Sequence, residues 1–107
     1  MDRIGESGAM AARAQAIVGD DPAFATILVE ERKSGLVFYR RVQPDSRPPW
    51  EGYYTLWARI VPEDTEHSLY RLEYMRYNNR WQSLEMVGPL EDCVREIRRD
   101  RFHVFFG

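Results

Sequence analysis

The fold is decided by the stretch Tyr53-Tyr54-Thr55-Leu56-Trp57-Ala58-Arg59-Ile60-Val61. Successive side chains of a β-strand point to opposite faces of a sheet, so every second residue shares a face. We expect the more uniformly apolar set to face the core, namely Tyr54, Leu56, Ala58 and Ile60. The alternate set would then present Tyr53, Trp57 and Arg59 on the opposite face. This stretch therefore predicts a sheet with one apolar face and one aromatic and Arg-rich face.

A hairpin is predicted before this strand. Residues 23–32 and 36–42 are both rich in strand-forming residues, and a short turn containing Gly35 separates them. The proline-rich residues 44–49 then connect to the central strand, since proline cannot continue a ladder of backbone hydrogen bonds. The chain thus brings two further strands to the sheet from its first half.

A second hairpin is predicted after the central strand. Residues 69–77 and 80–86 flank Asn78-Asn79, and Asn tolerates the positive φ that a tight turn requires. On the first of these strands we expect Arg71 on the outer face and three residues in the core, Tyr70, Leu72 and Tyr74. The sheet would therefore have about five antiparallel strands.

A helix is predicted at each end of the chain. Residues 9–18 have high helix propensity, and their apolar face would consist of Met10, Ala14, Ile17 and Val18. Residues after Pro89 begin with acidic and end with basic side chains, as the helix dipole favours. The predicted class is α+β, a single antiparallel sheet in the order α-β-β-β-β-β-α. We expect a flexible tail at 1–8 and one domain at 9–107, with the apolar residues 102–106 docked on it.

Composition excludes several classes of protein. The formal net charge of the 107 residues is −2, whereas a general nucleic-acid coat protein needs a strong basic excess. No apolar run is long enough for a bilayer, and we see no secretory signal. The single cysteine allows no intrachain disulfide, which fits a reducing compartment. We therefore expect a cytoplasmic protein with no membrane partner.

No set of residues predicts catalysis or a cofactor. His67 and His103 are far apart and Cys93 stands alone, so no spacing is typical of a metal site. The start of a helix would lower the pKa of Cys93, but its place on the apolar stripe favours a structural, half-buried thiol. Glu63, Asp64 and Glu66 indicate a solvated acidic loop without a basic companion. We predict no catalytic residue, no metal and no cofactor, with an unrecognised enzyme site as a remaining alternative.

The remaining candidate is a partner-binding surface on the sheet, formed by Tyr53, Trp57, Arg59 and Arg71. Aromatic side chains interleaved with Arg are typical of hot spots for protein partners, including a second copy in a homodimer. The principal prediction is a small non-enzymatic protein-binding module of accessory or inhibitor type. The opposing interpretation is that the sheet and helices simply bury these aromatic residues.

Single-stranded nucleic acid is the alternative partner, because exposed aromatic side chains also stack on bases. In that case the sheet face would be assisted by three helix residues, Arg95, Arg98 and Arg99. The opposing interpretation is a solvated helix end whose Arg side chains pair with Glu91 and Glu96.

The second half of the chain also carries a family resemblance. It rests on three segments, Tyr70 to Trp81, Leu90 to Ile97 and the ending Asp100-Arg101-Phe102-His103-Val104-Phe105-Phe106-Gly107. Residues 53–107 resemble a bacterial family, the domain-of-unknown-function family 3024 (DUF3024). Phe106 stands where the family pattern has Trp, and the N-terminal helix has no clear counterpart. The resemblance implies a small bacterial chain whose terminal Phe-Phe-Gly is part of the fold, and it implies no activity or binding residues.

Overall fold

The secondary-structure elements follow one another in the predicted order. The computed structural model describes residues 8–33, 35–42, 52–64, 66 and 68–106. Its elements are α2 (Gly8–Val18), the 3-10 helix η1 (Pro22–Phe24), β1 (Ile27–Arg32), β2 (Gly35–Val42), β3 (Tyr53–Pro62), β4 (Tyr70–Met75), β5 (Trp81–Gly88) and α3 (Leu90–Arg99). The α+β class and the order of helices and strands are confirmed. Residues 1–7 of the predicted tail and the proline-rich connection at 44–49 lie outside the described residues.

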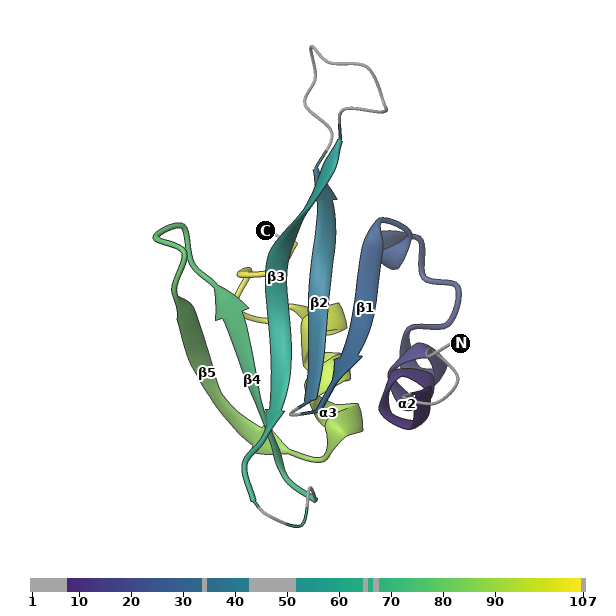
Figure 1. Cartoon of the computed structure of the whole chain (residues 1–107), viewed down its shortest axis with the longest axis vertical. Coiled ribbons are helices and arrows are strands. Elements are labelled where there is room, and N and C mark those ends of the chain that lie inside the picture. Colours follow the sequence, from purple (N-terminus) through teal and green to yellow (C-terminus); the bar gives the residue numbers. More distant parts are fainter. Residues whose placement is uncertain (1–7, 34, 43–51, 65, 67, 107) are drawn as a thin grey trace.

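The five strands form one antiparallel sheet in which each strand pairs with its neighbour in sequence. Figure 1 shows α3 crossing behind this sheet and α2 lying beside β1. The helices contact one another as well as the sheet. We call the sheet face that points away from α3 the outer face. Among the described helices, none is long and apolar enough to cross a lipid bilayer.

The core lies between the sheet and α3. Leu36 and Phe38 from β2 pair with Ile60 and Ala58 from β3, and all four side chains are fully buried. The apolar side of α3 covers them, and its buried apolar residues are Leu90, Cys93, Val94 and Ile97. The predicted apolar face of α2 is also confirmed, since Ala14 and Val18 are buried while Met10 and Ile17 pack partly against the core.

The alternation predicted for β3 is interrupted by a β-bulge at Trp57. Phe38 of β2 pairs with Ala58 and the next residue, Tyr39, pairs with Leu56, so Trp57 has no partner of its own. Such an extra residue reverses which side chains face inward on one side of it. Tyr54 and Leu56 are consequently exposed, and Trp57 is buried with 7 % of its surface accessible. The prediction was therefore wrong in placing Tyr54 and Leu56 in the core and Trp57 on the outer face. The prediction for β4 is confirmed, because its core residues are buried or pack against the core, namely Tyr70, Leu72 and Tyr74.

The residues after α3 pack on Trp57 without forming a strand among those described. The indole Nε1–H of Trp57 donates to the carbonyl oxygen of Phe105 at 3.0 Å. The rings of Phe105 and Phe106 meet the indole edge-to-face at centroid distances of 5.6 and 5.0 Å. The buried carboxylate of Asp100 accepts backbone N–H groups from Val104, Phe105 and Phe106 at 2.8–3.0 Å. These bonds hold residues 104–106 in place, so the predicted docking is confirmed for them, whereas Phe102 and His103 are exposed.

An ion pair joins the two helices across the sequence. Arg13 of α2 donates to both carboxylate oxygens of Glu91 in α3, at 2.7 and 3.0 Å. This hydrogen bond from Arg13 is the main reason that the pKa of Glu91 is lowered to about 2. A carboxylate with a lowered pKa in the folded state stabilises that state above its ordinary pKa, and the contribution is lost as the pH falls towards 2.

The bulge predicts very different effects of alanine at two adjacent positions. Trp57→Ala should lower the free energy of unfolding by about 3–5 kcal/mol, because it leaves a cavity and removes the hydrogen bond to Phe105. Leu56→Ala should cost less than about 1 kcal/mol, because much of that side chain is already in solvent. Urea unfolding followed by circular dichroism measures both. Equal losses for the two variants would contradict the bulge.

The helix–helix ion pair predicts a pH-dependent contribution to stability. Glu91→Gln should lower the free energy of unfolding by about 0.5–1 kcal/mol at pH 7, a modest value because both side chains are partly exposed. This difference should shrink between about pH 4.5 and pH 2, where Glu91 of the natural chain becomes protonated itself. Thermal unfolding across this range is the measurement, with Glu66→Gln in the β3–β4 loop as the control. A difference that stays constant down to pH 2 would refute the proposed role of Glu91.

Candidate partner-binding surface

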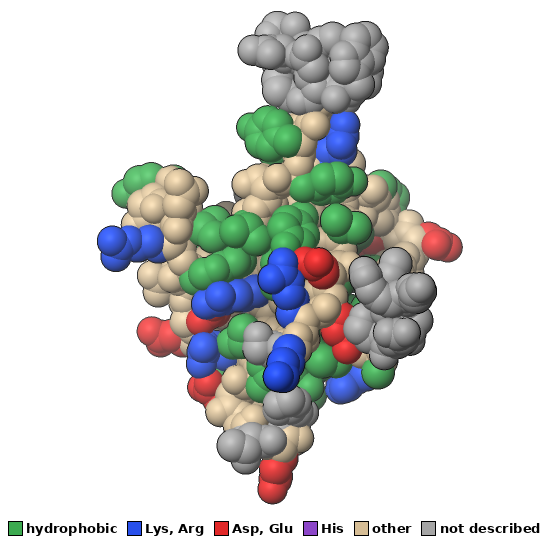
Figure 2. Space-filling view, in the orientation of Figure 1, with side chains coloured by type: hydrophobic (Ala, Val, Ile, Leu, Met, Phe, Trp, Pro, Cys, Tyr) green, Lys and Arg blue, Asp and Glu red, His purple; other side chains and the backbone are tan. Residues whose placement is uncertain are grey.

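The outer face carries no helix in the described part of the chain. Figure 2 views the molecule from this side, with hydrophobic side chains gathered over the upper half of the sheet and charged side chains across the middle. An antiparallel sheet often has one packed and one solvated face, but the solvated face is then mainly polar. The apolar residues here therefore need a separate explanation.

Four apolar residues adjoin one another on the outer face, Leu28, Tyr39, Tyr54 and Leu56, and we call them the apolar patch. The strand register places Leu28 of β1 opposite Tyr39 of β2, and Tyr39 opposite Leu56 of β3. Leu28 and Tyr54 are each 48 % exposed, and Leu56 is 40 % exposed. The hydroxyl group of Tyr39 donates to Glu30 at 2.9 Å, which fixes the ring at the sheet surface. The patch thus spans three strands.

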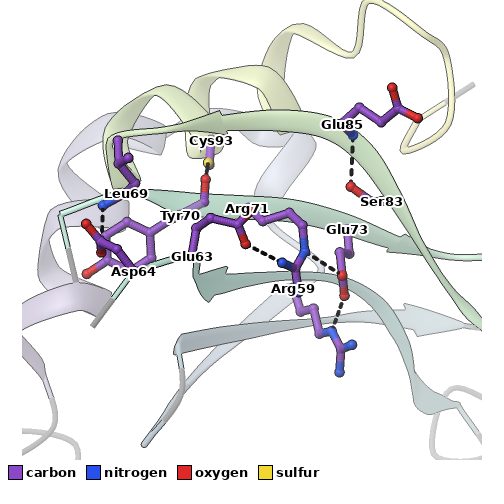
Figure 3. A network of polar contacts seen from close by, with 10 residues as sticks. All are labelled: Arg59, Glu63, Asp64, Leu69, Tyr70, Arg71, Glu73, Ser83, Glu85 and Cys93. Atoms are coloured by element: carbon purple, nitrogen blue, oxygen red, sulfur yellow. Dashed lines mark hydrogen bonds and ion pairs between the residues drawn. The ribbon is translucent and has the colours of Figure 1, made fainter. Parts of the chain in front are cut away.

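A group of ionised residues lies next to the apolar patch, and we call Arg59, Glu63, Arg71 and Glu73 the ionic row. Figure 3 shows Glu73 of β4 between the two Arg side chains. Its carboxylate accepts from Nε of Arg59 at 2.5 Å and from Nε of Arg71 at 2.9 Å. Arg71 also donates to Glu63, so the acidic loop does have the basic companion that the sequence did not predict. All four charges therefore have partners of opposite sign.

The pKa of Glu73 reflects two opposing influences. Burial of the carboxyl group acts to raise its pKa, but hydrogen bonds from Arg59 and Arg71 outweigh burial and lower it. Glu73 is therefore ionised at neutral pH although nearly all of it is buried. Removing one partner of such a group is costly, because a buried charge is left without compensation. Glu73 is thus a structural anchor that orients the two Arg side chains on the outer face.

The four residues predicted to bind a partner do not share one surface. Arg59 and Arg71 lie on the outer face as predicted, each with about a third of its side chain exposed. Trp57 belongs to the core. Tyr53 is exposed, but strand alternation places it in phase with Trp57 and not with Tyr54. The sequence analysis did not predict the apolar patch, because it did not predict the bulge that exposes Tyr54 and Leu56.

Trp81, at the start of β5, also belongs to this surface. The guanidinium carbon of Arg59 lies 4.5 Å from the centroid of the indole ring, in the range of a cation–π contact. The register pairs Trp81 with Met75 of β4, immediately beyond the ionic row. The outer face therefore combines an aromatic ring, an oriented cation and an apolar area.

The Arg side chains of α3 do not join the outer face, because α3 lies behind the sheet (Figure 1). Arg98 donates to Asp21 at 2.8 Å and Arg95 donates to Asp92 at 3.0 Å. The carboxylates expected to pair with them have other partners, since Glu91 binds Arg13 and Glu96 binds Arg101. Arg99 is exposed. The sheet face and the basic helix are thus two separate surfaces, which removes the expected cooperation of Arg95, Arg98 and Arg99 with the aromatic residues.

Among the described residues, neither a metal-binding group nor an accessible thiol is present. No three side chains of His, Cys, Asp or Glu in that part of the chain are grouped so that they could hold a metal ion. Cys93 is completely buried, and its thiol contacts the carbonyl oxygen of Tyr70 at 3.6 Å. Burial, assisted by Asp92, raises its pKa to about 12. This thiol is therefore structural and more buried than predicted. His103 is exposed, and His67 lies outside the described residues.

Comparison with models of protein families gives a match over most of the chain. The family model described as a domain of unknown function, DUF3024, matches residues 11–107. The resemblance is therefore not limited to residues 53–107, and most of the N-terminal helix is included. No curated protein and no solved structure matches the chain.

The burial of Cys93 predicts an unreactive thiol. Ellman's reagent should modify Cys93 only as fast as the domain unfolds, because both access and the thiolate form are suppressed. Absorbance at neutral pH, with and without denaturant, measures the rate. A Ser68→Cys variant supplies an exposed thiol in the same chain and should react at once. Rapid modification of the folded natural chain would show that Cys93 is accessible.

Proposed function

The chain belongs to the DUF3024 family, and we propose that it is a small non-enzymatic protein-binding module that uses the outer face of its sheet. The observation that carries this proposal is the exposure of the apolar patch on a face without a covering helix among the described residues. Contiguous apolar patches of this kind on monomeric proteins commonly mark interaction sites.

The neighbouring residues support a protein partner in particular. Trp, Tyr and Arg are enriched among residues that dominate the energy of protein–protein interfaces, and Trp81, Tyr54 and Arg59 are examples on this face. Their positions are fixed by contacts within the chain, as in the stacking of Arg59 on Trp81. Pre-ordered side chains lose less conformational entropy on binding, which favours affinity.

The charges of the outer face favour a protein over a nucleic acid. Arg71 binds Glu63 and Glu73, Arg59 binds Glu73, and Arg32 of β1 binds Glu30. Nucleic-acid affinity depends on cations that neutralise phosphates, and it would be opposed by the carboxylates among them. An accessory or inhibitor protein of the bacterial cytoplasm would fit this proposal, and the single cysteine accords with a reducing compartment.

Substitution of one patch residue tests the proposal. Leu56→Asp places a charge in the apolar patch and should abolish binding of a partner, because burying that charge is costly. The tagged chain would be used for affinity purification from cells of the native host, with quantitative mass spectrometry of the bound proteins. At least one protein should be retained by the natural chain and reduced by about tenfold or more with Leu56→Asp.

Leu69→Asp is the matched control, because Leu69 is 42 % exposed and lies outside the apolar patch, just before β4. Both variants must unfold at temperatures close to that of the natural chain. If Leu56→Asp retained every specifically bound protein as well as the natural chain does, the apolar patch would not be the binding surface. Salt-sensitive binding of single-stranded DNA or RNA that depends on Leu56 would instead favour the nucleic-acid alternative.

A further inference from the structure

Arg59 differs from Arg71 in how much of its guanidinium group is occupied. Arg71 donates from Nε to Glu73 and from Nη1 to Glu63. Arg59 donates only from Nε, and no acceptor is recorded among the described residues for its two terminal nitrogens. Figure 3 shows these two nitrogens directed away from Glu73. The planar fork of a guanidinium group matches the two oxygens of a carboxylate, so the free end of Arg59 is an oriented acceptor-binding group.

Two contacts fix the orientation of this fork. Nε of Arg59 lies 2.5 Å from the nearly buried carboxylate of Glu73, and its guanidinium carbon lies over the indole ring of Trp81, 4.5 Å from the ring centroid. Both oxygens of Glu73 are already occupied by Arg59 and Arg71. The fork of Arg59 therefore has to find its own acceptor in solvent or on a partner.

The strand register gives the backbone spacing between Arg59 and the apolar patch. Val37 of β2 lies opposite Arg59, and Tyr39, two residues further along, lies opposite Leu56. Two residues of a strand span about 7 Å, and an extended peptide places its residues i and i+2 on one side at the same spacing. A peptide running along β3 could therefore place one side chain over the apolar patch and direct a second, two residues away, towards the guanidinium group of Arg59, which lies against Trp81 of β5.

We propose that the outer face binds an extended acidic–apolar protein segment, with a carboxylate on the free fork of Arg59 and an apolar side chain two residues away on the apolar patch. This inference rests on the proposed function and specifies the partner's chemistry. The apolar contact supplies affinity, whereas the carboxylate supplies orientation and specificity. A phosphate group alone would satisfy the fork but leave the apolar patch in water.

A pair of peptides tests the inference on the natural chain. The probe is acetyl-Ala-Glu-Ala-Phe-Ala-amide, and its control has Gln in place of Glu. Titration of the ¹⁵N-labelled chain, followed by NMR, should give saturable shifts of the Trp81 indole and Leu56 amide signals, with a dissociation constant on the order of 1 mM. The Gln peptide should bind about threefold to fivefold more weakly, which is the upper part of the range for a partly exposed ion pair.

Arg59→Lys keeps the charge but removes the planar fork, so it should abolish the difference between the two peptides. Arg95→Lys on α3 is the matched control and should leave the difference unchanged. The inference is overturned by equal binding of both peptides, by shifts outside the outer face, or by the absence of saturable shifts. Self-association through Leu56 and Trp81 without peptide would also overturn it, since the occupant would then be a second copy.

Different results would contradict the proposed function and the proposed recognition of an acidic–apolar segment. If affinity purification depends on Leu56 but the Glu and Gln peptides bind equally, the outer face binds proteins without using the fork of Arg59. If no bound protein depends on Leu56, the proposed function itself is wrong.

Discussion

The structure depends on the β-bulge at Trp57. A regular strand would place Trp57 in solvent on the outer face and would turn Leu56 inward. With the extra residue, the indole ring enters the core, where Phe24 and the residues after α3 pack around it. The same bulge exposes Tyr54 and Leu56 next to Tyr39. The packing of the C-terminal segment and the existence of the apolar patch are therefore two results of one irregularity in β3.

The outer face is ordered by a second constraint, the nearly buried carboxylate of Glu73. An ionised group in this position requires compensation, and Arg59 and Arg71 supply it from two adjacent strands. Each of these two Arg side chains keeps about a third of its surface exposed. The ionic row thus restricts Arg59 enough for Trp81 to stack on it. Order on this face comes from contacts within the chain, before any partner is present.

Most of the fold could be predicted because it rests on local signals. The Asn78-Asn79 turn, the dipole-matched charges of α3 and the apolar face of α2 each depend on residues close in sequence. The candidate surface could be predicted only in part. Arg59 and Arg71 follow the regular alternation of their strands, whereas Tyr54, Leu56 and Trp57 do not.

The errors have a common physical cause. The bulge is stabilised by contacts of Trp57 with Phe105, which lies 48 residues away, and nothing in the alternation of residues 53–61 reveals such a contact. Two pairings of α3 side chains were missed for the same reason, since Arg13 and Asp21 reach Glu91 and Arg98 from the other end of the sequence. Local sequence patterns specify helices and strands. Tertiary packing decides which side chains far apart in the sequence come into contact.

The contact between Trp57 and Phe105 also affects how the chain folds while the ribosome synthesises it. Ribosomes release a chain from its N-terminus, so all five strands emerge before residues 100–106 are available. Until then the indole of Trp57 has no Phe105 carbonyl to bind and remains on an incompletely covered sheet. Such late closure between distant residues slows folding and leaves apolar surface open to nascent-chain chaperones. Nascent chains of this protein should thus pass through a chaperone-sensitive interval that ends only when the aromatic segment after α3 emerges.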